Sequence, residues 1–570
     1  MAIKKIRRYE HAGSQVCNIN PLLLQDEDAE LLRNVTTETL GTWKKRLGTR
    51  LRGSQTTTGV DILGIHQYDD SAGNTSSTLI ICNDRITPVN SDIYKQISTT
   101  LNGAITTVST SIILDDASDF TTIGNVEIEG DSILYTGKSS NTLTGASGVA
   151  IAHEDGVTAR QWIKSLENDT ASLKTRFRNF LDRAIRVNGT DAMKCWNGST
   201  WETTGDPINP DNATASSLIE IFGDRVFLAG GALFPDRLYG SSLPDVDNNI
   251  TWTTSVSIID KTGSNGFYID INPEDGQNIT GLDRNGGQLL IFKERSMYTW
   301  NGTDTQADVL VDVGAVSQEA IITIHNITFF LGRSKKNLGI YAYTGGFPKL
   351  ISRRIRKWID NIDQSNLGNI KIGADEDTVY FYIGNITFTG DDIYEDRAFT
   401  NVWLVYTISQ DAWKVYDNLN AKAFGYVNSS GQQLLVFGDN NGKVWELGQG
   451  TTDDSGDSKT PIQMEVITKE DSFGAPELPI TLHEIDVLSR QAYSTTVKYR
   501  YNRGPDWKAL GELSGRFTAL DCPEFDDQDN KGNTLQLQFT DYSQYQAAID
   551  GYTLHVDLET EVRKPSEGER

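Results

Sequence analysis

Short apolar runs, each stopped by glycine or asparagine, fill the stretch from residue 281 to residue 361. They lie at 289–292, 297–300, 321–324, 327–331 and 339–343. Strands this short and this evenly spaced predict a sheet array built by repetition, such as a sandwich, a barrel or a propeller. No catalytic group recurs inside the array. The pattern therefore predicts a structural framework of strands, and it does not point to a catalytic site.

The size and composition of the chain favour several β domains. With 570 residues it is too long for one ordinary hydrophobic core, so on the order of two to four domains are expected. Charged residues make up 23% and hydrophobic residues 38%, which is typical of a folded chain rather than a disordered one. The 51 glycines supply turns, and the aromatic residues favour pleated, half-buried surfaces. We predict an all-β protein.

The net charge of −25 restricts the partners of this chain. A dedicated nucleic-acid-binding protein presents a basic face to the phosphates, and this composition argues against one. An acidic wall repels phosphates, so the charge is still compatible with a protein that DNA slides past without sticking.

Cysteine usage and hydropathy narrow the class of protein further. Cys17, Cys82, Cys195 and Cys522 lie far apart and form no Cys-x-x-Cys pair, which indicates isolated reduced thiols rather than a disulfide frame or a zinc site. The opening residues MAIKKIRRYEHAGSQV lack the apolar stretch of a secretory signal, so we expect none. No window of apolar residues is long enough to predict a membrane span.

Strand groups follow one another over most of the chain. Each has a strand, a tight turn, a second strand, an aromatic residue and a Gly-rich exit, and the groups recur from 177–204 to 423–447. A spacing of about 40 to 50 residues matches the size of a propeller blade. We predict a β-propeller of about six to seven blades over residues 59–99 and 159–450.

The remaining segments differ from the propeller in texture. Residues 1–58 are expected to hold a basic arm, a short helix within 21–35 that begins at acidic residues, and the first propeller strand. Residues 100–158 are poor in aromatics and carry a hairpin signal at Glu129-Gly130-Asp131, which predicts a small inserted β domain.

Beyond residue 450 the pattern changes again. Residues 451–461 are a polar linker, and residues 462–560 show the clean alternation of an antiparallel β-sandwich with one buried side. Residues 561–570 are expected to be a frayed tail.

Two basic segments are candidate subunit interfaces. Five of the nine residues from Lys44 to Arg52 are basic, which fits either a phosphate-contacting patch or, as we favour, a strand with a solvated or interface-facing charged edge. Residues 350–362 have helical apolar spacing with cations mostly on the other face. That helix either has a solvated side or contacts an acidic neighbouring subunit. The candidate interface residues are Lys44, Lys45, Arg46, Arg353, Arg354, Arg356 and Lys357.

The sequence supports no catalytic, cofactor or metal site. It contains neither a phosphate-binding GxxxxGK[ST] loop nor a GxSxG nucleophile elbow. His153 and Glu154 begin like a zinc-binding helix, but Val157 stands where the second histidine would be. Residues 527–532 resemble the start of a calcium loop, but the fifth position is Lys531 and the twelfth is no glutamate. We predict a protein that is not an enzyme.

Several segments are similar, in the same order, to the tail nozzle or tubular-tail β-propeller proteins of short-tailed phages, of the packaged-DNA stabilisation type. The similar segments are LLLQDEDAELLRNVTTETLGTWKKRLGTRL, DRVFLAGGALFPDRLYGSSLPD, ITGLDRNGGQLLIFKERSMYTWNG, GAVSQEAI, GIYAYTGGFPKLISRRIRKWI and FGDNNGKVWELGQGTTDD. VEIEGDSILYTGKSSNTLTG resembles a small β module that is common in phage virion proteins. The inserted domain departs from the minimal pattern of the family.

The resemblance implies a structural virion protein, assembled in the host cytoplasm and placed in the phage tail. Its subunits would form a ring, often of six, beneath the portal and adaptor, line the DNA exit channel and help to retain packaged DNA until ejection. The expected partners are further copies of this chain, the portal or adaptor, other tail proteins and double-stranded DNA in transit.

Two other functions remain open. A receptor- or polysaccharide-binding tail protein would carry exposed aromatic clusters on a distal face. A propeller glycan hydrolase would need a pair of carboxyl groups in a central cavity, and with 77 acidic residues in the chain the sequence cannot nominate a pair.

Overall fold

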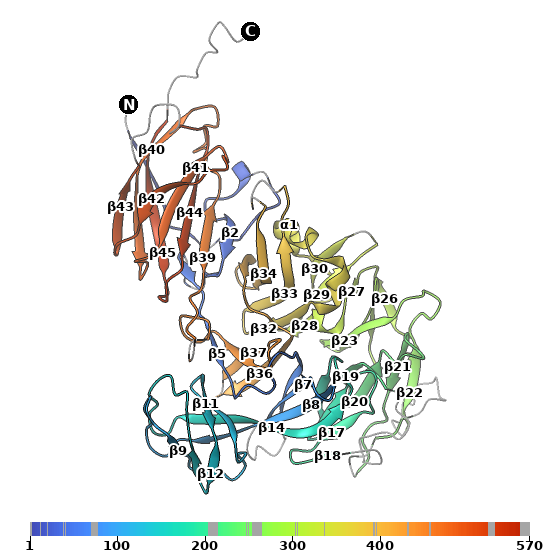
Figure 1. Ribbon diagram of the computed structural model, residues 1–570. Helices are drawn as coiled ribbons and strands as arrows, with labels where there is room; N and C mark the ends of the chain where they lie inside the picture. The colour runs from blue at the N-terminus through green and yellow to red at the C-terminus, as the bar shows by residue number, and fades with distance from the viewer. Residues whose placement is uncertain are drawn as a thin grey trace.

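The computed structural model describes residues 3–558 except 12, 20, 38, 40, 70–77, 203–214, 247, 249, 253–264, 303, 305, 336, 391–393, 395, 430–431, 455, 457 and 523–530. The described residues are mostly strands and the turns between them, which confirms the all-β prediction. Figure 1 shows a propeller in the lower part of the molecule and a sandwich above it. The expected tail at 561–570 and most of the calcium-like sequence at 527–532 lie outside the described residues.

Seven blades of four strands can be traced in the described part of the chain, at the upper end of the expected range. From the innermost strand outward, blade 1 contains β6 (Ile62–Tyr68), β7 (Thr78–Arg85), β8 (Asn90–Thr100) and β14 (Thr158–Asp169), and blade 2 contains β15 (Arg176–Phe180), β16 (Arg183–Val187), β17 (Lys194–Trp196) and β18 (Trp201–Glu202). In the same order, blade 3 contains β19 (Leu218–Phe222), β20 (Arg225–Ala229), β21 (Arg237–Gly240) and β22 (Phe267–Asp270), and blade 4 contains β23 (Ile279–Asn285), β24 (Gln288–Lys293), β25 (Met297–Trp300) and β26 (Asp308–Val311). Blade 5 contains β28 (Ile321–Ile324), β29 (Ile327–Arg333), β30 (Leu338–Tyr343) and β31 (Lys349–Leu350), with β27 (Gly314–Ala315) added beside β29. Blade 6 contains β32 (Lys371–Ala374), β33 (Thr378–Thr387), β34 (Ala398–Thr407) and β35 (Ala412–Tyr416), and blade 7 contains β36 (Ala423–Ser429), β37 (Gln432–Gly438), β38 (Val444–Leu447) and β5 (Thr49–Leu51).

The innermost strands of the blades form a closed ring. β6 contacts β15, the contacts continue through β19, β23, β28 and β32 to β36, and β36 returns to β6. The seventh blade takes its outermost strand from the other end of the chain, because β5 pairs with β38 and sets Leu51 opposite Trp445. Sharing a sheet between the two ends of the propeller removes the open edge where the ring would otherwise separate.

The hydrophobic core of the propeller is divided among the gaps between blades. Each gap holds a separate cluster of buried side chains, from blades 1 and 2 around to blades 7 and 1. Trp196 lies in the first of these clusters, Trp300 between blades 3 and 4, and Trp403 between blades 6 and 7. Large aromatic rings fill the wedge between two twisted sheets, which is why this chain needs so many of them.

The sandwich is built from both ends of the chain, although the sequence pattern indicated residues 462–560 alone. One sheet contains β1 (Lys4–Arg8), β3 (Val35–Thr36), β4 (Trp43–Lys45), β40 (Ile480–Arg490), β43 (Phe517–Asp521) and β45 (Ala548–Leu558). The other contains β2 (Ala29–Arg33), β39 (Met464–Thr468), β41 (Thr496–Tyr501), β42 (Lys508–Glu512) and β44 (Leu535–Asp541). The two sheets enclose one cluster of buried side chains that includes Trp43 and Phe539.

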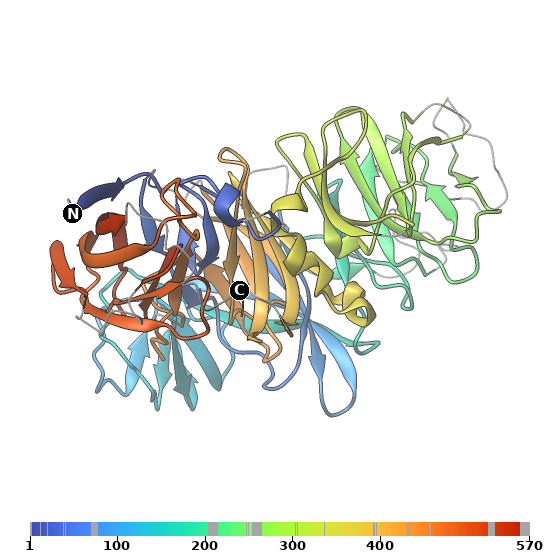
Figure 2. The same ribbon diagram turned by 90° about the horizontal axis from the view of Figure 1, so that it is seen from above.

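Strand β2 joins the sandwich to the propeller. It pairs antiparallel with β39 of the sandwich and parallel with β35 of blade 6, so one nine-stranded sheet runs from β32 to β42. Figures 1 and 2 place the sandwich, and also the inserted domain, on the side of the propeller away from blades 3 and 4. Blade 6 and the sandwich are therefore joined by backbone pairing through β2, which on the side of blade 6 sets Arg33 opposite Val415.

The helix expected within residues 21–35 is wrong. The structure has only a 3-10 turn η1 (Pro21–Leu23), and the residues after it form β2. The acidic residues 26–28 suggested the first turn of a helix, but they precede a strand in which Glu30 and Arg33 are buried beside partners far away in the chain, Arg503 for Glu30 and Asp417 for Arg33. Pairing on both edges of β2 outweighs the local helical spacing.

The residues between β8 and β14 form a compact body outside blade 1. They contain β9 (Ser111–Ile113), β10 (Gly124–Ile128), β11 (Asp131–Tyr135), β12 (Gly137–Ser139) and β13 (Thr142–Thr144), and they share a hydrophobic cluster that extends from Leu101 to Ala159. The predicted hairpin is confirmed, with Ile128 opposite Asp131 and positive φ at Glu129 and Gly130 as a two-residue turn requires.

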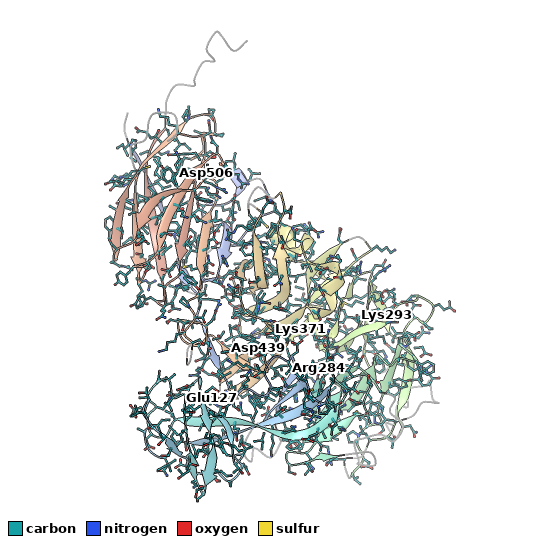
Figure 3. The ribbon with its side chains drawn as sticks, viewed as in Figure 1. Glu127, Arg284, Lys293, Lys371, Asp439 and Asp506 are labelled. Atoms are coloured by element: carbon teal, nitrogen blue, oxygen red, sulfur yellow. The ribbon has the colours of Figure 1, made fainter. Side chains whose placement is uncertain are left out.

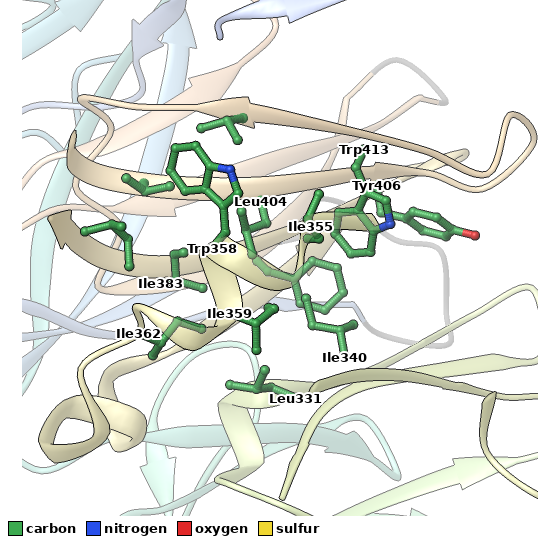
Figure 4. Packing of buried hydrophobic residues seen from close by; sticks show 14 of the residues in the cluster. Leu331, Ile340, Ile355, Trp358, Ile359, Ile362, Ile383, Leu404, Tyr406 and Trp413 are labelled. Carbon is green, nitrogen blue, oxygen red and sulfur yellow. The ribbon is translucent and has the colours of Figure 1, made fainter. Parts of the chain in front are cut away.

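The helical spacing at 350–362 produces two short turns rather than one helix. A 3-10 turn η3 (Ser352–Ile355) leads into α1 (Arg356–Asp360), and η4 (Gln364–Asn369) follows; η2 (Gln318–Ala320) is a further 3-10 turn in blade 5. Ile355, Trp358 and Ile359 point into the gap between blades 5 and 6, as Figure 4 shows. None of the described helices has the length and apolar character that a membrane crossing requires.

The first prediction concerns this inter-blade core. Trp358 is 0% exposed, packs against Phe388 and Phe399, and donates a hydrogen bond to the Tyr394 hydroxyl at 2.9 Å. Trp358→Ala should lower the free energy of unfolding by about 3–5 kcal/mol, because the vacated volume cannot be refilled. Chemical denaturation measures the change.

Phe347→Ala is the control for this loss, since Phe347 is 80% exposed and its truncation should change the stability by less than about 0.5 kcal/mol. Equal losses in the two variants would contradict the assignment of Trp358 to the core.

Candidate functional site

A cavity of about 400 Å³ lies on the axis of the propeller. Its wall comes from the innermost strands, so residues that are distant in sequence face one another across it. The polar lining includes His66 on β6, Arg176 and Arg178 on β15, Glu319 on η2, Lys371 on β32 and Asn428 on β36. Figure 3 places Lys371 near the middle of the propeller. The propeller axis is therefore the candidate site.

A cationic cluster surrounds Glu319 in this cavity. Arg176 contacts the Glu319 carboxylate through Nη2 at 2.5 Å, and Lys174 Nζ lies 3.2 Å from its other oxygen. Burial alone would raise the pKa of Glu319, but the charges of Arg176, Lys174 and Lys371 outweigh it and lower the pKa to about 2. Glu319 therefore stays ionised and serves as an anchor for cations rather than as a proton donor.

Lys371 is the unusual member of the cluster. It is 6% exposed, and among the described residues its ammonium group has neither a hydrogen-bond acceptor nor a carboxylate within 4.0 Å. Burial lowers its pKa to about 7; Glu319 opposes this shift, while Lys174 and Arg176 add to it. A buried ammonium group without a counter-ion is destabilising, which makes this position a candidate for function.

A second group lies where the innermost strands of blades 2 to 5 end. Glu220 accepts two contacts from Arg178, at 2.9 and 2.8 Å, and Asp283 accepts a hydrogen bond from Thr323 at 2.7 Å. Both carboxyl groups line a hollow of about 720 Å³. Burial raises the pKa of Asp283 to about 6, and the nearby charge of Glu220 adds to the rise. A carboxyl group with a raised pKa near a second carboxyl group is the kind of arrangement that the hydrolase alternative requires.

The predicted interface residues of the 44–52 segment serve another purpose. Lys45 is fully buried and pairs with Asp541 of the sandwich, and Arg46 is buried and holds Asp453 through two contacts at 2.9 and 2.7 Å. Neither faces another subunit, because their charges are satisfied inside this chain. Lys44 is half-buried and lines a hollow of about 500 Å³ at the sandwich.

The predicted interface residues of the helical turns lie on the outside. Arg353 and Arg354 are exposed, and Arg354 donates a hydrogen bond to the Asp411 carbonyl at 3.0 Å. Arg356 pairs with Asp360 one turn later at 2.6 Å, and Lys357 is half-buried. Their role as a subunit interface stays a prediction.

Sequence reasoning did not find the residues of the propeller axis. Lys174, Glu319 and Lys371 carry no motif and are separated by long stretches of chain. Only the order of the blades brings these residues together. The sequence feature that could have predicted their proximity is the repeat of the strand groups, and not the residues around each position.

One group of described residues has the composition of a metal site. Glu484, Asp486 and His555 offer ligand atoms within 4.8 Å of one another on the outer face of the sandwich. Both ring nitrogens of His555 already contact a carboxylate at 2.9 Å. A metal ion would have to displace one of these contacts.

Comparison with known proteins gives likeness of fold only. No protein-family model and no curated protein matches the sequence. Among solved structures, YCF48 from Cyanidioschyzon merolae has a TM-score of 0.34 at 9% identity over 70% of this chain and 98% of that one. The WD40 β-propeller domain of Doa1 has a TM-score of 0.35 at 8% identity over 72% of this chain and 99% of that one. An exo-β-1,3-galactanase from Phanerochaete chrysosporium has a TM-score of 0.23 at 8% identity over 68% of this chain and 97% of that one. Similarity at this level says nothing about activity or partners.

The second prediction contrasts two buried lysines, both labelled in Figure 3. Lys371→Met should raise the free energy of unfolding at pH 7 by about 1–4 kcal/mol, because it removes a buried charge that has no partner. Lys293→Met should lower it by about 3–5 kcal/mol, since the fully buried Lys293 pairs with Asp275 at 2.8 Å and the carboxylate would lose its counter-ion. Thermal and chemical unfolding measure both effects.

The pH dependence supplies an internal check. Between pH 7 and about pH 10 the unfolded chain keeps the proton of Lys371 while the folded chain has released it. The contribution of this position to the free energy of unfolding therefore rises with pH across that window in the native protein. In Lys371→Met this contribution does not change with pH. The same pH slope in both proteins would contradict the assigned environment.

Proposed function

We propose that this protein is a structural, non-enzymatic component of a phage tail, whose subunits form a ring around the path of DNA exit and help to retain packaged DNA until ejection. The observation that supports this most directly is the continuous sheet from blade 6 into the sandwich, together with the closure of blade 7 by β5. Both joints give a subunit that transmits force as one piece. The sequence resemblance to tail nozzle proteins supports the proposed place in the virion.

Exposed apolar residues support assembly with further copies. Val246 and Leu233 lie in the loops of blade 3 and Phe347 in a loop of blade 5, and all three side chains are largely exposed. Phe347 lies just ahead of the exposed cations Arg353 and Arg354. Apolar groups beside exposed charge are typical of protein–protein contacts.

The charge distribution favours passage of DNA without binding. The basic run from Lys44 to Arg52 is largely used inside the chain, with Arg50 and Arg52 on Glu446 and Lys45 on Asp541. Among the described residues the buried acidic and basic side chains are nearly equal in number, so the excess of acidic residues is not buried in the core. An acidic wall keeps a DNA duplex moving because it offers no phosphate contacts.

The third prediction tests the ring. Electron microscopy of the purified protein, with sedimentation to measure its mass, should show ring-shaped oligomers with an acidic lumen. The double variant Arg353→Glu/Arg354→Glu should raise the dissociation constant by about tenfold or more, because it sets negative charge against an acidic neighbour. Lys335→Glu, at a side chain that is also exposed, is the matched control and should assemble normally.

A protein that stays monomeric at all concentrations, or a ring with a strongly basic lumen, would contradict the proposal. Turnover of a bacterial surface glycan that is abolished by Asp283→Asn would replace it with the hydrolase alternative.

Carbohydrate binding by the sandwich is a second candidate function. Tyr493, Arg490, Arg516 and Gln546 line one hollow of about 500 Å³, and the exposed Tyr545 adjoins Gln546 in the chain. Exposed aromatic rings beside arginine and amide groups suit a sugar ring with its hydroxyls.

The fourth prediction tests this candidate on an array of bacterial surface polysaccharides. If the hollow holds a glycan, the native protein binds at least one of them and Tyr493→Ala loses most of that signal, because the stacking surface is gone. Phe347→Ala, an exposed aromatic residue of the propeller, should leave binding unchanged. Absence of any glycan signal from the native protein removes the candidate.

A further inference from the structure

We propose that the cavity on the propeller axis binds a small phosphate-type oxyanion, either inorganic phosphate or the phosphate group of a small organic molecule. The binding groups are Lys371 and Arg176, which line the cavity, and Lys174, which lines the hollow that adjoins it. This inference goes beyond the proposed role in a tail ring and does not depend on it.

Charge is the first ground for this inference. Arg176 and Lys174 both contact the carboxylate of Glu319, and Lys371 lies near them without a carboxylate of its own, so the group has an excess of positive charge within a chain of net charge −25. A bound dianion would neutralise that excess. Buried charges in proteins are normally paired, and an unoccupied excess of this kind is a position where an anion gains the most.

Unused hydrogen-bond donors are the second ground. Arg176 donates through Nη1 to the Ser217 carbonyl and contacts Glu319 through Nη2, while its buried Nε has no acceptor among the described residues. The Lys371 ammonium group lacks an acceptor in the same part of the chain and lines the cavity. Donors of this kind, fixed by a rigid ring of strands, suit the oxygen atoms of a phosphate group.

The shape of the site leaves room for more than a bare ion. A neighbouring hollow of about 520 Å³ shares Lys371 and Lys422 with the cavity, and Asn366, Asn369 and Asn420 line it. Amide side chains both donate and accept hydrogen bonds, so they suit the hydroxyl groups of a phosphorylated polyol. Pockets of about 300–1,000 Å³ hold ligands of that size.

The test is isothermal titration calorimetry of the full-length protein with inorganic phosphate and with glycerol 3-phosphate, at constant ionic strength in chloride. Saturable binding of either probe is expected. Lys371→Met should weaken it by about tenfold to a hundredfold, the loss that follows removal of one charged hydrogen bond. Lys335→Met, at an exposed lysine, should bind as the native protein does.

The two probes distinguish the sources of the phosphate. Equal affinity indicates a site for the free ion, and a tenfold preference for glycerol 3-phosphate indicates an organic ligand that extends into the asparagine-lined hollow. Binding of neither probe, or equal binding by the native protein and Lys371→Met, overturns the proposal.

A measurement on the native protein alone covers the case in which the variant does not fold. Sulfate remains a dianion between pH 6 and pH 9, so any change in its affinity comes from the protein. Affinity should fall as pH rises through 7, because Lys371 loses its proton. The charged and titratable groups facing Lys371 are Glu319 on η2, Lys174 and Arg176 at the start of blade 2, and Asp61, Asp363, Tyr382 and Lys422 around the adjoining hollow. A flat profile from pH 6 to pH 9 contradicts the site.

Discussion

Closure of the propeller by β5 is the constraint on which the rest of the structure depends. Arg50 contacts the buried Glu446 of β38 at 2.8 Å, and Arg52 holds its other oxygen, so the outermost strand of blade 7 is fixed by charge as well as by backbone pairing. The residues just before β5 place Lys45 on Asp541 of the sandwich and Arg46 on Asp453. One short segment therefore closes the ring and attaches the sandwich. Because its partners lie about 400 to 500 residues later in the chain, both events depend on contacts between remote segments.

A closed ring fixes what the axis of the propeller contains. Every innermost strand must present one face to the axis, and in this chain those faces carry charge: Arg178 and Glu220 near one end, Lys371 and Glu319 near the other. The two ends differ in how charge is balanced. Glu220 satisfies Arg178, and burial with the nearby charge of Glu220 raises the pKa of Asp283 to about 6, whereas Lys371 is buried among cations. Rigid surroundings keep this imbalance from relaxing.

The sequence predicted those features that depend on local chemistry. Turn residues between short apolar runs indicated the blades, and Glu129-Gly130 specified a hairpin, because strand length and turn type are decided within a few residues. Local chemistry failed for β2, because the acidic residues 26–28 resemble the first turn of a helix, whereas Glu30 and Arg33 after them pair with the remote Arg503 and Asp417. The same reason explains why the buried roles of Lys45 and Arg46, and the whole axial cluster, were missed. Their partners are set by topology, and single-sequence patterns contain no distances between remote segments.

The proposed tail ring and the proposed anion site use different spaces in the assembly. In an assembled ring DNA would move through the space between subunits, whereas the axial cavity belongs to each subunit and has a volume of about 400 Å³, too small for a duplex. The charges also separate the two. Acidic residues dominate the chain as a whole, so they disfavour a long polyanion at the surface, while the buried Lys371 on the axis lies beside the cations Lys174 and Arg176. The proposed anion site would therefore select by size before it selects by chemistry, because only a small anion fits the cavity and gains from its charge.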